Sequence, residues 1–208
     1  SALLRGLSFV ALAQAAGGMI FLLMFGAVLG PSRHRIERTA RVSALAALVL
    51  LPAQFALEAA RMAGNLAGVL DTGLQAFALS TSLAHVVAAR MIGVVLLLLA
   101  LTGSRPWTRL AGASAVLLLA GSFALTGHTA ADDQRWLLAP LLVLHVLVVS
   151  FWFGALRPLI HVTAGEPASV SAQVVARFSR IAGWMVPGIL LAGLVLTARL
   201  LPDIQALG

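Results

Sequence analysis

Three of the five histidines, His85, His128 and His145, occupy comparable positions near the same end of three consecutive apolar segments. Imidazole nitrogen is a common ligand for copper, zinc and iron. The chain contains no cysteine, so thiolate ligands and disulfides are excluded. Three imidazoles in one layer on neighbouring segments predict a metal or cofactor site. A lone intramembrane histidine, in contrast, is often only a hydrogen-bonded link between helices.

The segments that carry these histidines are long and apolar. Only 10% of the 208 positions are charged, and apolar residues make up 61%. This apolar content is more than a soluble domain of this size can bury. About 20 apolar residues cross the hydrocarbon core of a bilayer as a helix. The sequence therefore predicts an all-α polytopic membrane helix bundle that forms a single domain over residues 1–208. Six transmembrane helices are expected at residues 7–30, 42–63, 77–102, 109–129, 137–160 and 181–201.

Arginine supplies all the basic charge, and it alternates between the two ends of these spans. Nine of the arginines lie in or beside the first, third and fifth connections: Arg33, Arg35, Arg38, Arg41, Arg105, Arg109, Arg157, Arg177 and Arg180. Positive charge is enriched in cytoplasmic loops, so both termini are expected outside, in the periplasm of a bacterium. The net charge of +7 therefore reflects orientation in the bilayer, and we exclude nucleic acid as a partner.

Other short patterns concern packing and connections. Residues 71–75 are expected to form a loop or a short surface helix, and residues 162–169 the only loop long enough to be mobile. Small side chains predict close contact between helices in lipid. They recur in the first predicted helix and in the last, at Ala11, Ala15, Gly18, Gly183, Gly188, Ala192 and Gly193.

Several polar residues share the outer half of the predicted bundle with the histidines. His145 lies roughly 12 Å below the outer edge at the helical rise per residue, and Gln14 and Arg90 are about as deep. An arginine in the hydrocarbon layer costs at least about 2.5–3.5 kcal/mol on insertion scales, so Arg90 needs a partner. Glu58 is the expected one. The alternative role for this pair is an ion pair that only locks the bundle.

Methionines descend from the same outer mouth toward the arginine-bearing end, at Met62, Met91, Met19 and Met24. Thioether sulfur is a ligand for reduced copper, so the series could pass the ion inward. Methionine also fills irregular gaps in apolar cores, and packing alone accounts for each one taken singly.

Two motifs resemble a known family. The first begins with Gly127-His128-Thr129-Ala130 and continues with His145-Val146-Leu147-Val148-Val149-Ser150-Phe151-Trp152-Phe153-Gly154-Ala155-Leu156-Arg157-Pro158-Leu159. The second is Arg177-Phe178-Ser179-Arg180, followed by Gly193-Leu194-Val195-Leu196. This pattern is similar to the copper resistance protein D family, whose members carry Trp-x-Gly-Gly-Leu-x-Pro where Ala155 here replaces the second glycine. The resemblance also extends to span order and loop length.

The resemblance implies residues and a role. His128 matches the family's glycine–histidine position, His145 and Trp152 match the fifth-helix motif, and Arg90 looks like the arginine often found in the third helix. It implies copper uptake across, or copper delivery at, the bacterial inner membrane. It also implies a periplasmic partner of the copper resistance protein C type. Members usually have eight spans, so this chain resembles either a fragment or a shorter relative.

Three other classes of function compete with copper handling. A b-type haem protein needs two histidines at one depth on facing helices, and His85 with His145 fits this better than His128 with His145. An enzyme is not expected, because no nucleophile–base pair, phosphate-binding loop, Gly-x-Ser-x-Gly or His-Glu-x-x-His occurs. A structural subunit would use the same polar layer only to lock its helices.

Overall fold

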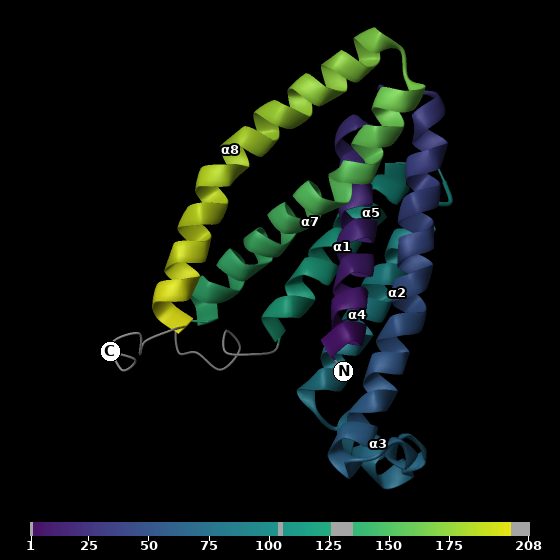
Figure 1. Cartoon of the computed structure of the whole chain (residues 1–208), viewed down its shortest axis with the longest axis vertical. Coiled ribbons are helices and arrows are strands. Elements are labelled where there is room, and N and C mark those ends of the chain that lie inside the picture. Colours follow the sequence, from purple (N-terminus) through teal and green to yellow (C-terminus); the bar gives the residue numbers. More distant parts are fainter. Residues whose placement is uncertain (1, 104–105, 126–134, 201–208) are drawn as a thin grey trace.

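The computed structural model describes residues 2–103, 106–125 and 135–200, and these residues form helices and turns without a strand (Figure 1). The elements follow in the order α1 (Ala2–Phe25), α2 (Pro31–Ala63), η1 (Leu66–Leu70), α3 (Thr72–Leu79), α4 (Ser82–Ala100), α5 (Pro106–Gly121), η2 (Ser122–Leu125), α7 (Arg135–Gly165) and α8 (Ala168–Leu200). The elements η1 and η2 are short 3-10 helices.

Six of the described helices are long and apolar enough to cross a membrane, which confirms the number of spans predicted from the sequence. Their ends differ from the predicted ones. Helix α2 begins at Pro31 rather than near residue 42, and α7 continues through Pro158 to Gly165. The predicted ends mark only the apolar part of each helix, which crosses the hydrocarbon core. Helices α2 and α7 continue beyond that part.

Helix α1 is the central element of the bundle. It packs against α2 and α7 along much of its length and also contacts α5 and α4. The most apolar part of α1 is 61% buried, compared with 11% for the corresponding part of α8. A helix that is apolar on all sides is suited to such a position, because every face meets another helix or lipid.

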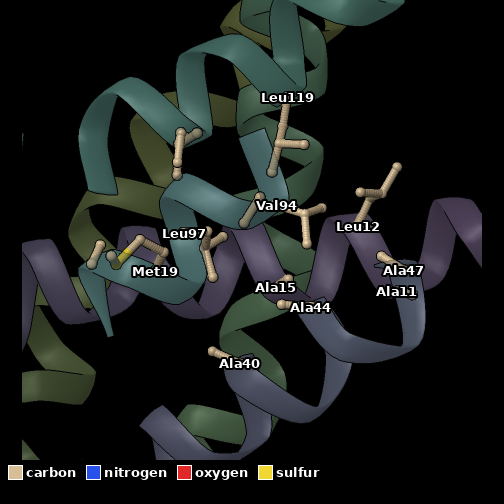
Figure 2. Packing of buried hydrophobic residues seen from close by; sticks show 14 of the residues in the cluster. Ala11, Leu12, Ala15, Met19, Ala40, Ala44, Ala47, Val94, Leu97 and Leu119 are labelled. Atoms are coloured by element: carbon tan, nitrogen blue, oxygen red, sulfur yellow. The ribbon is translucent and has the colours of Figure 1, made fainter. Parts of the chain in front are cut away.

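Small side chains bring α1 and α2 together. Ala40, Ala44 and Ala47 recur on one face of α2 and are buried against Ala11 and Ala15 of α1 (Figure 2). Leucine and valine side chains from α4 and α5 complete this cluster with Val94, Leu97 and Leu119 (Figure 2). Helices associate in lipid mainly through such close packing, so these alanines fix where α2 lies on α1.

Two glycines bring the backbones of α1 and α7 into contact. A Cβ atom added to Gly17 would lie 2.0 Å from the Ser150 carbonyl oxygen and 2.5 Å from the Gly154 Cα atom. The buried Gln14 side chain donates a hydrogen bond of 3.1 Å from Nε2 to the Gly154 carbonyl oxygen. Only glycine leaves room for this approach, which holds the middle of α7 against α1.

Helix α8 contacts α7 and diverges from the rest of the bundle toward its C-terminal end (Figure 1). The expectation that its small residues mediate helix contact is wrong for Gly183, Gly188 and Gly193, because a Cβ atom on any of them would meet nothing within 4 Å. Ala192 is buried, as are Ala11 and Ala15 of the first helix. The same sequence pattern therefore marks a contact in α1 and largely open space in α8.

The arginine-bearing connections lie together at one end of the bundle, as the alternation of charge predicts (Figure 1). Arg33 Nη1 donates to the Gly26 carbonyl oxygen at 3.2 Å, and Arg41 Nη2 donates to the Leu101 carbonyl oxygen at 3.0 Å. Cationic groups at the last carbonyls of a helix are favourable, so these arginines stabilise the ends of α1 and α4. We call this end the arginine end.

The connection between α7 and α8 is only two residues long, so the expectation of a mobile loop over residues 162–169 is wrong. The Glu166 carboxylate accepts hydrogen bonds from the backbone N–H groups of Gly30 and Ser32, at 2.9 Å and 3.0 Å, and from the Ser32 hydroxyl. A carboxylate at a helix N-terminus is favourable. Glu166 therefore ties the α7–α8 turn to the start of α2.

The opposite end carries the N-terminus of α1 and the connection from α2 to α4. Gly64, at a φ of 71°, ends α2 in the left-handed conformation that glycine adopts without strain. The short surface helix expected near residues 71–75 is confirmed as α3, and the Asp71 side chain caps it by accepting from the N–H groups of Gly73 and Leu74. We call this end the α3 end.

Candidate metal site

His145 lies ten residues into α7, which places it roughly 15 Å from the start of that helix at the α3 end. Its side chain is half-buried. Its Nδ1 atom is buried and has no hydrogen-bond partner among the residues that the structure describes. Such a nitrogen costs about 1–3 kcal/mol when it stays unpaired, so this position favours a polar partner from outside the described residues.

The other two predicted ligands are placed differently. His85 is exposed in the first turn of α4, which packs mainly against α5 and α2, whereas α7 packs mainly against α1 and α8. His128 lies outside the described residues. Within the described ranges, no three histidine, aspartate or glutamate side chains gather closely enough to hold an ion. A site built from three histidines, and a haem site that uses His85 and His145, therefore stay predictions.

Arg90 finds partners other than the expected one. Its Nε atom donates to the Ser122 hydroxyl at 3.1 Å, and its guanidinium carbon lies 4.3 Å from the centre of the Phe123 ring. The Phe123 ring packs edge-on against Phe9 at 5.8 Å between centroids. The guanidinium group is thus held by a hydroxyl and an aromatic face that come from η2, and α1 supports that aromatic ring.

The predicted pair of Arg90 with Glu58 is wrong. Both Glu58 carboxylate oxygens accept from Nη1 of Arg61, at 2.9 Å and 2.8 Å, and Arg5 Nη2 lies 3.5 Å away. Arg61 is one helical turn from Glu58, so this pair forms without any tertiary contact. The carboxylate therefore stays at the α3 end of α2.

Two glutamines belong to the same polar half of the bundle. The Gln54 Oε1 atom is buried and, like His145 Nδ1, has no hydrogen-bond partner in the described part of the chain. Gln14 is paired with the Gly154 carbonyl oxygen. Sequence reasoning missed the roles of Ser122 and Phe123. The sequence did offer a signal, because Ser122 and Phe123 lie shortly before His128. This predicts for them a depth that an intramembrane arginine on a neighbouring helix can reach.

Trp152 and the methionines show mixed environments. Trp152 is 41% exposed and, with Val149, lines an apolar groove of about 320 Å³ between α7 and α8. His145 shares this face of α7 by its spacing.

Met62 is 41% exposed at the end of α2, whereas Met19 is buried in the alanine-rich cluster. Met91 is partly buried and packs against the same cluster, so packing accounts for both Met19 and Met91.

Six apolar helices with unpaired polar atoms in one half define a multi-pass membrane protein whose bundle lies in lipid. The chain matches the family described as copper resistance protein D-like, N-terminal domain, over residues 1–136. It therefore belongs to the copper resistance protein D family. This match covers α1 to α5, whereas the sequence motifs that suggested the family lie mostly after residue 127. No curated protein and no solved structure matches the chain.

Proposed function

We propose that this protein takes up copper across the bacterial inner membrane, or delivers copper there, through a histidine-based site in the half of the bundle near the α3 end. Membership of a copper resistance family supports a role in copper handling in general. The observation that carries the finer proposal is the buried Nδ1 atom of His145, which has no hydrogen-bond partner among the described residues. A copper ion would satisfy this nitrogen, because imidazole is a good ligand for both oxidation states.

The proposed partner of His145 follows from the sequence. His128 is the second ligand that we propose, since it precedes the start of α7 by only seven residues. The arginine end is assigned to the cytoplasm by the positive-inside rule, which leaves the site on the periplasmic side. A periplasmic copper-binding protein of the copper resistance protein C type would then meet the α3 end. Transport or delivery requires no chemical step, so we propose no catalytic residue.

Copper binding by purified protein tests this proposal. Cu(I) is titrated under reducing conditions against a chromogenic chelator, for the natural chain and for the variants His145→Ala and His161→Ala. His161 is the matched control, because it lies on the same helix at the arginine end and contacts Thr39 at 3.4 Å. We expect His161→Ala to retain copper and His145→Ala to bind at least tenfold more weakly.

Two outcomes would contradict the proposal. Unchanged copper affinity in the double variant His128→Ala/His145→Ala would remove both proposed ligands from the site. A Soret band with sharp reduced bands in the purified protein would favour the haem reading instead. Copper uptake into proteoliposomes that enclose a Cu(I) probe then separates transport from delivery, because only transport loads the probe.

A further inference from the structure

A cavity at the arginine end has no part in the proposed copper site. It has a volume of about 250 Å³ and opens where the ends of α1 and α4 meet the starts of α2 and α5. Arg33, Glu37 and Arg109 supply charged groups to its wall. The rest of the lining is mostly apolar and includes Met19 and Leu22 of α1. The cavity thus combines a charged rim with an apolar wall at the end of the membrane spans.

The charges of this cavity favour an anion. Arg33 donates from Nε to Glu37 Oε1 at 2.8 Å and from Nη1 to the Gly26 carbonyl oxygen, so its pairing with Glu37 neutralises one of the two guanidinium groups. Arg109 is exposed, and its Nη2 atom donates a long hydrogen bond of 3.4 Å to the Leu23 carbonyl oxygen. The net charge of the lining is therefore +1. Both arginines keep N–H groups that have no partner among the described residues.

A third guanidinium group strengthens the positive potential. Arg41 donates to the carbonyl oxygen of Leu101, and Leu101 lines the cavity. The potential of several arginines at one opening disfavours a copper cation, so this opening is poorly suited as a copper exit. Capping of the helix ends accounts for one N–H of each arginine, but it does not account for the cavity beside them.

We propose that this cavity binds the phosphate group of an anionic phospholipid. Guanidinium groups match phosphate in geometry and charge. Basic pockets between transmembrane helices are suited to anionic headgroups. The phosphate would lie between Arg33 and Arg109, and the glycerol and first methylene groups would lie against Met19 and Leu22. An amphiphilic ligand fits this lining better than a free phosphate ion, which has no apolar part.

Lipid binding is measured on the full chain in a neutral detergent by thermal unfolding and native mass spectrometry. Dioleoyl phosphatidylglycerol is compared with dioleoyl phosphatidylcholine and with inorganic phosphate. We expect phosphatidylglycerol to raise the melting temperature and to stay bound, and phosphatidylcholine and phosphate at the same concentration to do neither. A shift produced equally by inorganic phosphate would show that the free ion is the ligand and would overturn the lipid assignment.

Charge variants locate the binding site. Arg33→Gln/Arg109→Gln should bind phosphatidylglycerol at least tenfold more weakly, whereas Arg38→Gln/Arg180→Gln removes the same charge from exposed positions at the same end and should bind normally. Because the first pair also loses helix caps, a second test leaves the arginines in place. Ala27 is exposed and lines the cavity. Ala27→Glu should lose the lipid, and Ala27→Gln should keep it. Equal binding by these last two variants would overturn the proposal.

Discussion

Replacing Gly154 with alanine places a methyl group where the backbones of α1 and α7 touch. The added Cβ atom would lie 2.4 Å from the Gly17 Cα atom and 2.9 Å from the Ala13 carbonyl oxygen. Both partners are backbone atoms, so no flexible side chain can move aside. The two helices must separate by on the order of 1 Å at this crossing, because close-packed interiors leave no spare room.

Three effects decide the size of the change. Overpacking of this kind costs about 1–3 kcal/mol. Separation of the helices also weakens the hydrogen bond from Gln14 to the Gly154 carbonyl oxygen, which is 3.1 Å long and contributes about 0.5–1.5 kcal/mol. Against these, alanine in a helix interior is better than glycine by about 0.5–1 kcal/mol. We therefore expect Gly154→Ala to lower the free energy of unfolding by about 1–3 kcal/mol.

Unfolding by sodium dodecyl sulfate in mixed micelles, followed by circular dichroism, measures this change. Gly188→Ala in α8 is the matched control, because its added Cβ atom would meet nothing within 4 Å. The control should gain about 0.5–1 kcal/mol from helix propensity alone. The two variants should thus differ in sign. A Gly154→Ala protein as stable as the control would refute the backbone contact between α1 and α7.

Further predictions concern the half-buried Arg90, the contact of Glu166 with the start of α2, and Met19. Arg90→Met should leave the free energy of unfolding unchanged or raise it. The cost of inserting arginine, about 2.5–3.5 kcal/mol, matches or exceeds the loss of the contacts to Ser122 and Phe123. A lower free energy of unfolding in the variant would show that Arg90 locks the bundle. Hydrogen bonds, first from the Ser32 hydroxyl, hold the pKa of Glu166 below its ordinary value of 4.5, opposed by desolvation. The stabilisation by this carboxylate is therefore complete above pH 4.5 and lost as pH falls below it, and melting curves of Glu166→Gln should lack this acid-side decline. Met19→Leu should cost less than about 1.5 kcal/mol and keep copper uptake, and a selective fall in uptake would assign a role to the sulfur atom.

Hydropathy predicts the six spans and the pairing of their connections, because the bilayer fixes the length of a span and the side on which arginine accumulates. It does not predict where a helix ends. Helix α2 begins well before its apolar part, at Pro31, and its first turns carry Arg33, Arg35 and Arg38 in water. These residues are compatible with a helix, and the Glu166 carboxylate that caps it comes from the far end of α7. A contact over such a distance in sequence leaves no local signal.

Small residues show a second limit of sequence reasoning. Gly18 of α1 and Gly188 of α8 have similar apolar surroundings in the sequence, yet a Cβ atom on Gly18 would lie 3.1 Å from the Ala40 Cβ atom and one on Gly188 would meet nothing within 4 Å. Glycine permits a close approach, but the neighbouring helix has to supply it. Helix α2 presents a row of alanines to α1, and the described part of the chain presents no such row to α8.

Counting residues along a helix gives a depth but not a lateral position. Arg90 lies eight residues into α4 and His145 ten residues into α7, which predicts a similar depth for both. Whether two residues meet depends on the rotation and neighbours of each helix. Arg90 turns toward η2, and Glu58 is already paired with Arg61, one turn away on the same helix. Depth alone therefore does not identify the partner of Arg90.

The neighbours of α7 limit where a second ligand for His145 can come from. His145 shares a face of α7 with Val149 and Trp152, and that face borders α8 rather than α4. A ligand on α4, such as His85, would have to reach past α5. The segment between η2 and α7 contains His128, and in the sequence it leads directly into α7. If copper binds through His145, removal of His128 should therefore weaken the site strongly, and removal of His85 should leave it nearly unchanged.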